Sequence, residues 1–140
     1  MKIAIIGSMK FTQEMLATEK KLRELGHDAN IPLGVEPHLS DGTFVDNLED
    51  NLAFCIEHNV MRRNFQQVAE SDAVVVLNYK RNGVEGYIGI SALMEMAIAH
   101  FLKKKIFLMR ATPKMSHARW AHEVAIMQPT VINDDLKKIR

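Results

Sequence analysis

The stretch AVVVLNYKRNGVEGYIGISALMEMAIAHFL, residues 73–102, places a strand, a glycine-containing loop and a helix in succession. AVVVLNY, residues 73–79, is a run of β-branched apolar residues, which is typical of a strand buried on both faces of a parallel sheet. The segment after the loop is apolar on nearly all sides, so it predicts a buried helix. KIFLMRA, residues 105–111, predicts the next strand. A strand–helix–strand unit of this kind favours a parallel sheet.

The same alternation extends in both directions from this unit. We expect strands at 2–7, 27–33 and 130–133, helices at 12–25, 43–72 and 117–127, a loop at 34–42 and a solvated tail at 134–140. Thr12 is the expected N-cap of the first helix, and the long 43–72 helix should break near His58 and Asn59. The chain is therefore predicted to form one α/β domain, residues 1–140. Its expected architecture is a Rossmann-like three-layer α/β/α fold with a mostly parallel five-stranded sheet.

Composition narrows the classes of function. Lys plus Arg number 18 and Asp plus Glu number 17, so no electrostatic footprint for nucleic acid or an anionic membrane is present. No apolar run reaches the roughly 20 residues that a membrane span needs. The single cysteine, Cys55, fits a reducing cytosol, and we expect a cytoplasmic protein. Cys55 and His58 lack a third ligand, so we expect neither a metal site nor a cofactor.

Ligands of parallel α/β folds gather at the carboxyl ends of the strands, which here are the loops at 7–10, after Asn78 and at 111–117. In the first loop, GSMK, backbone N–H groups and Lys10 could hold a phosphate, although an ordinary turn with a solvent lysine would look the same. The three glycines of NGVEGYIG suggest close approach of backbone to a ligand, although a flexible surface loop is the competing explanation.

Glu95 is the one carboxylate within the apolar helix, and its neighbours at i±3 and i±4 include no basic residue. We expect it within the first turn or so of that helix, near the ligand crevice, where it could act as a nucleophile or general base. The alternative is a solvent-facing acid favoured by the helix macrodipole.

Four segments, GSMKF, SDAVVVLNY, GYIGISALMEMAIAH and KKIFLM, resemble the nucleoside 2-deoxyribosyltransferase superfamily in order and spacing. That superfamily includes nucleoside deoxyribosyltransferases and 2′-deoxynucleoside 5′-phosphate N-hydrolases. The resemblance spans nearly the whole chain, and the ending MQPTVINDDL is similar to one branch of it. It implies that Glu95 attacks the sugar C1′ and that Gly7, Ser8 and Lys10 occupy the phosphate-contacting loop. The expected substrate-binding positions, from the resemblance and the two loops together, are Gly7, Ser8, Met9, Lys10, Asn64, Tyr87, Gly89 and Ser91.

The chain departs from the family pattern at three positions that support the glutamate. Ala4 stands where members have a tyrosine, Asn64 where they have an aspartate, and Gly89 where they have Asp or Ser. Ser91 or Tyr87 are the candidates to substitute. Deoxyribosyl transfer between free bases is the activity most weakened by these departures.

Three functions follow as hypotheses. The first is cleavage of an N-glycosidic bond, by hydrolysis or glycosyl transfer, on a nucleotide or nucleoside, with Glu95 as nucleophile. The second is a non-catalytic nucleotide-binding or sensing module of the same fold. The third is cleavage of NAD, because NAD-cleaving TIR domains have a related layered fold and also use a glutamate. The resemblance and the apolar helix further predict a homodimer or higher homo-oligomer.

Overall fold

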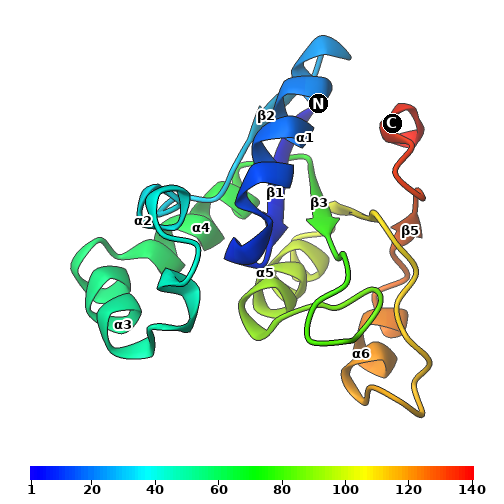
Figure 1. Cartoon of the computed structure of the whole chain (residues 1–140). Coiled ribbons are helices and arrows are strands. Elements are labelled where there is room, and N and C mark those ends of the chain that lie inside the picture. Colours follow the sequence, from blue (N-terminus) through cyan, green and yellow to red (C-terminus); the bar gives the residue numbers. More distant parts are fainter.

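A computed structural model describes all 140 residues, and its centre is one five-stranded sheet (Figure 1). The strands lie in the order β2-β1-β3-β4-β5 and every neighbouring pair is parallel. Their bounds are β1 (Lys2–Gly7), β2 (Asp28–Asn30), β3 (Ala73–Leu77), β4 (Lys105–Leu108) and β5 (Thr130–Val131). The predicted α/β class and five-stranded sheet are confirmed, and the sheet is parallel throughout.

Helices cover both faces of the sheet, which gives the predicted three layers. The helices are α1 (Thr12–Glu24), α2 (Glu36–Ser40), α3 (Leu48–Glu57), α4 (Val60–Ala69), α5 (Ile90–Phe101) and α6 (Trp120–Ile126). One hydrophobic cluster joins alternate residues of β1 and β3 to α1, and the other joins the opposite residues of the same strands to α4, α5 and α6. Because successive strand residues face opposite ways, both clusters draw on the same β-branched runs. In Figure 1, α2 and α3 project away from the sheet.

Several predicted boundaries are wrong. The strands β2 and β5 are shorter than the expected 27–33 and 130–133, and the helices α3 and α6 begin later than the expected 43 and 117. The segment 34–42 was expected to be a loop, yet it contains α2, whose first turn holds Pro37, a residue with its φ already set for a helix. Thr12 was expected to cap α1 but is its first residue. A short 3-10 turn, Met9–Phe11, precedes it, and the capping side chain is that of Ser8. The turn moves the start of helical structure upstream of Thr12.

The break near His58 and Asn59 is confirmed, because Asn59 has a left-handed backbone (φ 51°) between α3 and α4. The tail expected at 134–140 is not fully solvated. Leu136 and Ile139 are buried in the cluster that contains α1. None of the helices has both the length and the apolar character that a membrane crossing requires.

Helix α5 is only half buried in the single chain, although its composition predicted burial on all sides. Ala92, Glu95, Met96 and Ala99 form its buried stripe, at the i, i+3, i+4, i+7 spacing of one helix face. On the other side, Ile90 and Phe101 are each 81% exposed. Its composition is therefore explained by one face in the core and a second apolar face left open to contact.

Candidate functional site

The candidate site lies at the carboxyl ends of β1 and β3. In the strand order β2-β1-β3, the chain leaves β1 toward one edge and later returns to β3 on the other side, so the connections diverge between these two strands. Such a switch point is where doubly wound sheets bind ligands. Gly7 ends β1 there, and a Cβ at this position would lie 3.0 Å from the carbonyl oxygen of Leu77. The close strand ends explain why a glycine stands at this turn.

The first loop is organised around the Ser8 hydroxyl. Its Oγ accepts a hydrogen bond from the Lys10 backbone N–H at 3.2 Å and another from a guanidinium nitrogen of Arg81. The Lys10 ammonium lies 3.1 Å from the Gly42 carbonyl oxygen and 3.1 Å from a carboxylate oxygen of Asp46. The sequence predicted Gly7, Ser8, Met9 and Lys10 as one site. These residues form one turn, in which the Lys10 side chain is partly exposed. Arg81 and Asp46 were not predicted.

Arg81 is presented by a two-residue β-hairpin within the 80–89 loop. Arg81 and Val84 exchange backbone hydrogen bonds of 3.1 and 2.9 Å. The central residues, Asn82 and Gly83, have φ of 53° and 75°, as a type I′ turn requires. The Asn-Gly dipeptide is the sequence signal that would have identified this turn. Arg81 reaches Ser8, 73 residues away in the chain, which no local pattern could indicate.

Tyr87 connects this hairpin to the start of α5. The Arg81 guanidinium lies 5.8 Å from the centre of the Tyr87 ring, and the Trp120 ring meets Tyr87 edge-on at 6.4 Å. A Cβ at Gly89 would lie 3.6 Å from the Tyr87 ring, so this ring covers the beginning of the helix. Ser91 is exposed in the first turn of α5 and makes no hydrogen bond through its side chain. The structure thus brings Tyr87 and Gly89 together beside Arg81.

Glu95 is 8% exposed and makes no hydrogen bond or ion pair. Burial raises the pKa of its carboxyl to about 7, because the charged form loses solvation and no partner compensates. It was expected within the first turn or so of its helix. Because α5 begins at Ile90, Glu95 is the sixth residue and lies in the second turn. It is about 9 Å along the axis from Gly89, at 1.5 Å per residue. The helix macrodipole, which acts within the first turn, therefore gives its charge little support.

Asn64 holds the chain after β2. Its carbonyl oxygen accepts a bond from the Leu33 N–H at 2.8 Å, and its amide nitrogen donates to the Leu33 carbonyl at 3.3 Å. Asn78 makes the same kind of double bond, to the backbone of Arg110, at 2.7 and 2.9 Å. Both amides are buried, so these bonds satisfy groups that would otherwise be costly. The amide of Asn64 is thereby committed to backbone rather than open toward a ligand.

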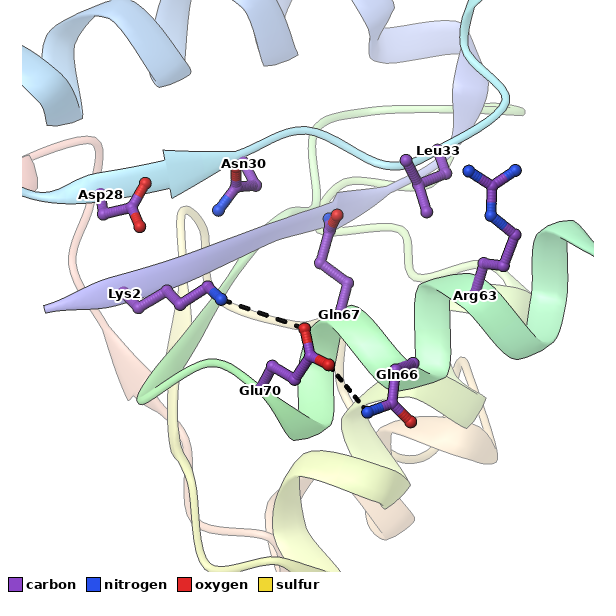
Figure 2. Close-up of a pocket in the computed structure, with 8 residues that line it drawn as sticks. All are labelled: Lys2, Asp28, Asn30, Leu33, Arg63, Gln66, Gln67 and Glu70. Carbon is purple, nitrogen blue, oxygen red and sulfur yellow. Dashed lines mark hydrogen bonds and ion pairs between the residues drawn. The ribbon is translucent and has the colours of Figure 1, made fainter.

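Two surface hollows do not include Glu95 in their lining. One, of about 380 Å³, is lined by residues of β1, β2 and α4, and Figure 2 shows Glu70 in it linked to Lys2 and Gln66. Another, of about 530 Å³, lies beside α2 and the start of α4. Neither includes the first loop or the Arg81 hairpin. The first is polar and solvent-open, and two of its charged residues, Lys2 and Glu70, pair with each other.

No group of three or more His, Cys, Asp or Glu side chains is placed so that it could hold a metal ion.

No protein-family model, no curated protein and no solved structure matches this chain. The resemblance to nucleoside 2-deoxyribosyltransferases therefore stays a prediction made from the residues. The candidate site consists of the first loop, the Arg81 hairpin, Tyr87 and the N-terminal half of α5.

Proposed function

We propose that this protein cleaves the N-glycosidic bond of a nucleotide or nucleoside, with Glu95 as the nucleophile. The observation that carries the proposal is a buried carboxyl without a partner, in the helix that follows the switch-point loop. A structural carboxylate at such depth normally has an ion pair or hydrogen bonds. A group kept without them, with its pKa moved toward neutrality, is typical of a residue retained for chemistry.

In the proposed reaction, the ionised Glu95 carboxylate attacks the sugar C1′ as the bond from C1′ to the base nitrogen breaks. The base leaves with the bonding electrons and takes a proton from solvent. The sugar is then held as an ester of Glu95. Water, or a second base in the case of transfer, attacks C1′ and releases the carboxylate. The apolar surroundings of Glu95 strengthen its attraction for the positive charge that develops on the sugar.

The first loop would bind the end of the substrate opposite the base. Ser8 supplies a hydroxyl hydrogen and Lys10 an ammonium, which suit a phosphate. Gly7 and Met9 belong to the same turn. Tyr87 offers an aromatic face beside the start of α5 for the sugar or base, with Gly89 and Ser91 at the helix terminus. Monophosphates are therefore the favoured substrates over nucleosides.

A non-catalytic nucleotide-binding module is the second candidate. A pKa of about 7 leaves much of Glu95 protonated and unreactive at neutral pH. Ala4, on the β1 face toward α5, has no group that could hydrogen-bond the carboxylate, and the Asn64 amide is already bonded to Leu33. These facts favour slow turnover or binding alone. The two candidates differ in one measurable result, which is whether free base is released from the bound ligand.

The test is incubation with a panel of nucleoside and deoxynucleoside monophosphates, the corresponding nucleosides and NAD, followed by chromatography for free base. Glu95→Gln should abolish base release while ligand affinity stays within about tenfold, because the charge matters mainly when the sugar becomes cationic. Glu49→Gln, which removes an exposed and unpaired carboxylate, is the matched control and should leave release unchanged. Release by Glu95→Gln at the wild-type rate would contradict the nucleophile assignment. Binding without release by the wild type would favour the second candidate.

A further inference from the structure

We propose that Arg81 determines specificity for a phosphomonoester, and that the Asp46 carboxylate occupies the place which the ligand's phosphate takes over. The inference rests on the proposed function only in placing the ligand at the first loop. It concerns recognition of the phosphate and does not require base release. Its basis is one anionic side chain held between two cations that come from different loops.

The Asp46 carboxylate bridges the two cations with its two oxygens. One oxygen lies 3.1 Å from the Lys10 ammonium, and the other lies 3.4 Å from a guanidinium nitrogen of Arg81. The second guanidinium nitrogen of Arg81 donates to the Ser8 hydroxyl. Two donors, the Lys10 ammonium and one guanidinium nitrogen of Arg81, therefore meet at the Asp46 carboxylate beside the first loop. The Asp46 carboxylate occupies this position, which shows where these two cations favour negative charge.

The Ser8 hydroxyl, which binds Arg81, keeps one hydrogen that the chain does not use. A hydroxyl has two acceptor lone pairs and one hydrogen. Both lone pairs of Ser8 are used, by the Lys10 backbone N–H and by Arg81, while its hydrogen is donated to no group of the chain. A phosphate oxygen, which is only an acceptor, would complete this arrangement.

Charge favours a phosphomonoester over the carboxylate. Lys10 and Arg81 together carry two positive charges and Asp46 neutralises one of them, whereas a phosphomonoester carries about −1.5 to −2 at pH 7. Arg81 also offers the planar fork that matches phosphate oxygens, and it is held in place against the Tyr87 ring. Lys10 alone would supply only a point charge.

Asp46 is placed where it can leave. Its side chain is 64% exposed, whereas that of Arg81 is only 19% exposed. Asp46 lies in a 3-10 turn, Phe44–Asp46, that follows α2 outside the sheet layers. An ion pair this exposed is weak, so a better-matched anion displaces it readily. Arg81 and Ser8 stay in position while Asp46 gives way.

Titration calorimetry with inorganic phosphate, four deoxynucleoside monophosphates and the corresponding nucleosides tests the inference. Arg81→Lys keeps the charge but loses the fork, and it should weaken monophosphate binding by about tenfold. Asp46→Asn removes the competing charge and should tighten monophosphate binding by about two- to fivefold. Both effects should be smaller for the corresponding nucleosides, which lack the phosphate. Arg62→Lys and Glu49→Gln make the same chemical changes at exposed positions that form no ion pair, and they should stay within about twofold of wild type.

The two substitutions should also be coupled. In the Arg81→Lys background, the gain from Asp46→Asn should shrink, because Asp46 competes for the guanidinium that has been removed. The inference is overturned if Asp46→Asn leaves monophosphate affinity unchanged or lowers it, if Arg81→Lys equals Arg62→Lys, or if wild type binds no phosphate compound. Tight monophosphate binding without base release would reject the proposed reaction and keep this inference. Base release from nucleosides alone would reject this inference and keep the proposed reaction. Binding of inorganic phosphate as tight as that of monophosphates would assign the site to free phosphate.

Discussion

Replacing Glu95 with glutamine should remove a pH dependence from the stability of this protein. Burial raises the pKa of Glu95 from its ordinary 4.5 to about 7, and no partner offsets the lost solvation. The folded protein therefore binds the proton of this carboxyl more tightly than the unfolded chain does. Below about pH 4.5 the group is protonated in both states and costs nothing. As the pH rises through 7, the folded state must hold a buried charge and stability falls.

The magnitude follows from the shift of 2.5 units, between 4.5 and about 7. At about 1.36 kcal/mol per unit, the charged carboxylate lowers the free energy of unfolding by about 3 kcal/mol at alkaline pH. Most of this loss, about 2 to 3 kcal/mol, falls between pH 5 and pH 8.5. Glutamine has nearly the same shape and no charge. Its buried amide has a cost of its own, but that cost does not change with pH.

Urea unfolding of wild type and Glu95→Gln at pH 5 and pH 8.5 measures the effect. The stability of the variant relative to wild type should increase by about 2 to 3 kcal/mol from the lower to the higher pH. Glu49→Gln, on the exposed side of α3, should show no such change. If the difference between Glu95→Gln and wild type is the same at both pH values, within about 0.5 kcal/mol, Glu95 is not a buried and unpaired carboxyl, and the reasoning fails.

The same ionisation should control the proposed reaction, because only the carboxylate is a nucleophile. Base release at low substrate concentration should rise with pH through about 7 and then level off. The profile of kcat/KM against pH measures it. A rate that falls as pH rises from 6 to 8 would contradict a role for ionised Glu95.

Three further predictions concern the phosphate loop, the 80–89 loop and the exposed face of α5. Lys10→Ala should weaken monophosphate binding by about 1–3 kcal/mol in calorimetry and leave nucleoside binding unchanged; equal affinity of wild type for both ligands would count against the assignment. Gly86→Ala should destabilise the fold by more than about 2 kcal/mol in urea unfolding, because a Cβ there would overlap the Ala111 carbonyl oxygen, whereas Gly83→Ala, with a positive φ but open space, should cost only about 1 kcal/mol. Light scattering at micromolar concentration should give at least a dimer, and Phe101→Lys, which places a charge on the exposed apolar face of α5, should reduce association; a monomeric wild type would contradict this.

Local sequence determined the secondary structure of the sheet and the edge that carries the candidate site. The β-branched runs KIAIIG and AVVVL can be satisfied only as strands covered on both faces, and their alternation with helices requires parallel crossovers. Glycines at the strand end and in the 80–89 loop then mark where the backbone turns or packs closely. For these reasons the fold class, the first loop and the helix of Glu95 could all be predicted.

Only the tertiary structure shows which residues distant in sequence contact each other and which side chains these contacts bury. Sequence periodicity could not tell which face of α5 is buried, because both faces are apolar, nor that Glu95 would have no partner. The meeting of Ser8 with Arg81 depends on a hairpin that crosses from β3 to the end of β1. Asn64 was predicted as a ligand contact, but an amide matches a backbone N–H and C=O equally well, and the chain after β2 supplies both. Spacing along the chain fixes local backbone geometry, whereas hydrogen-bond partners and burial are set by approach in space.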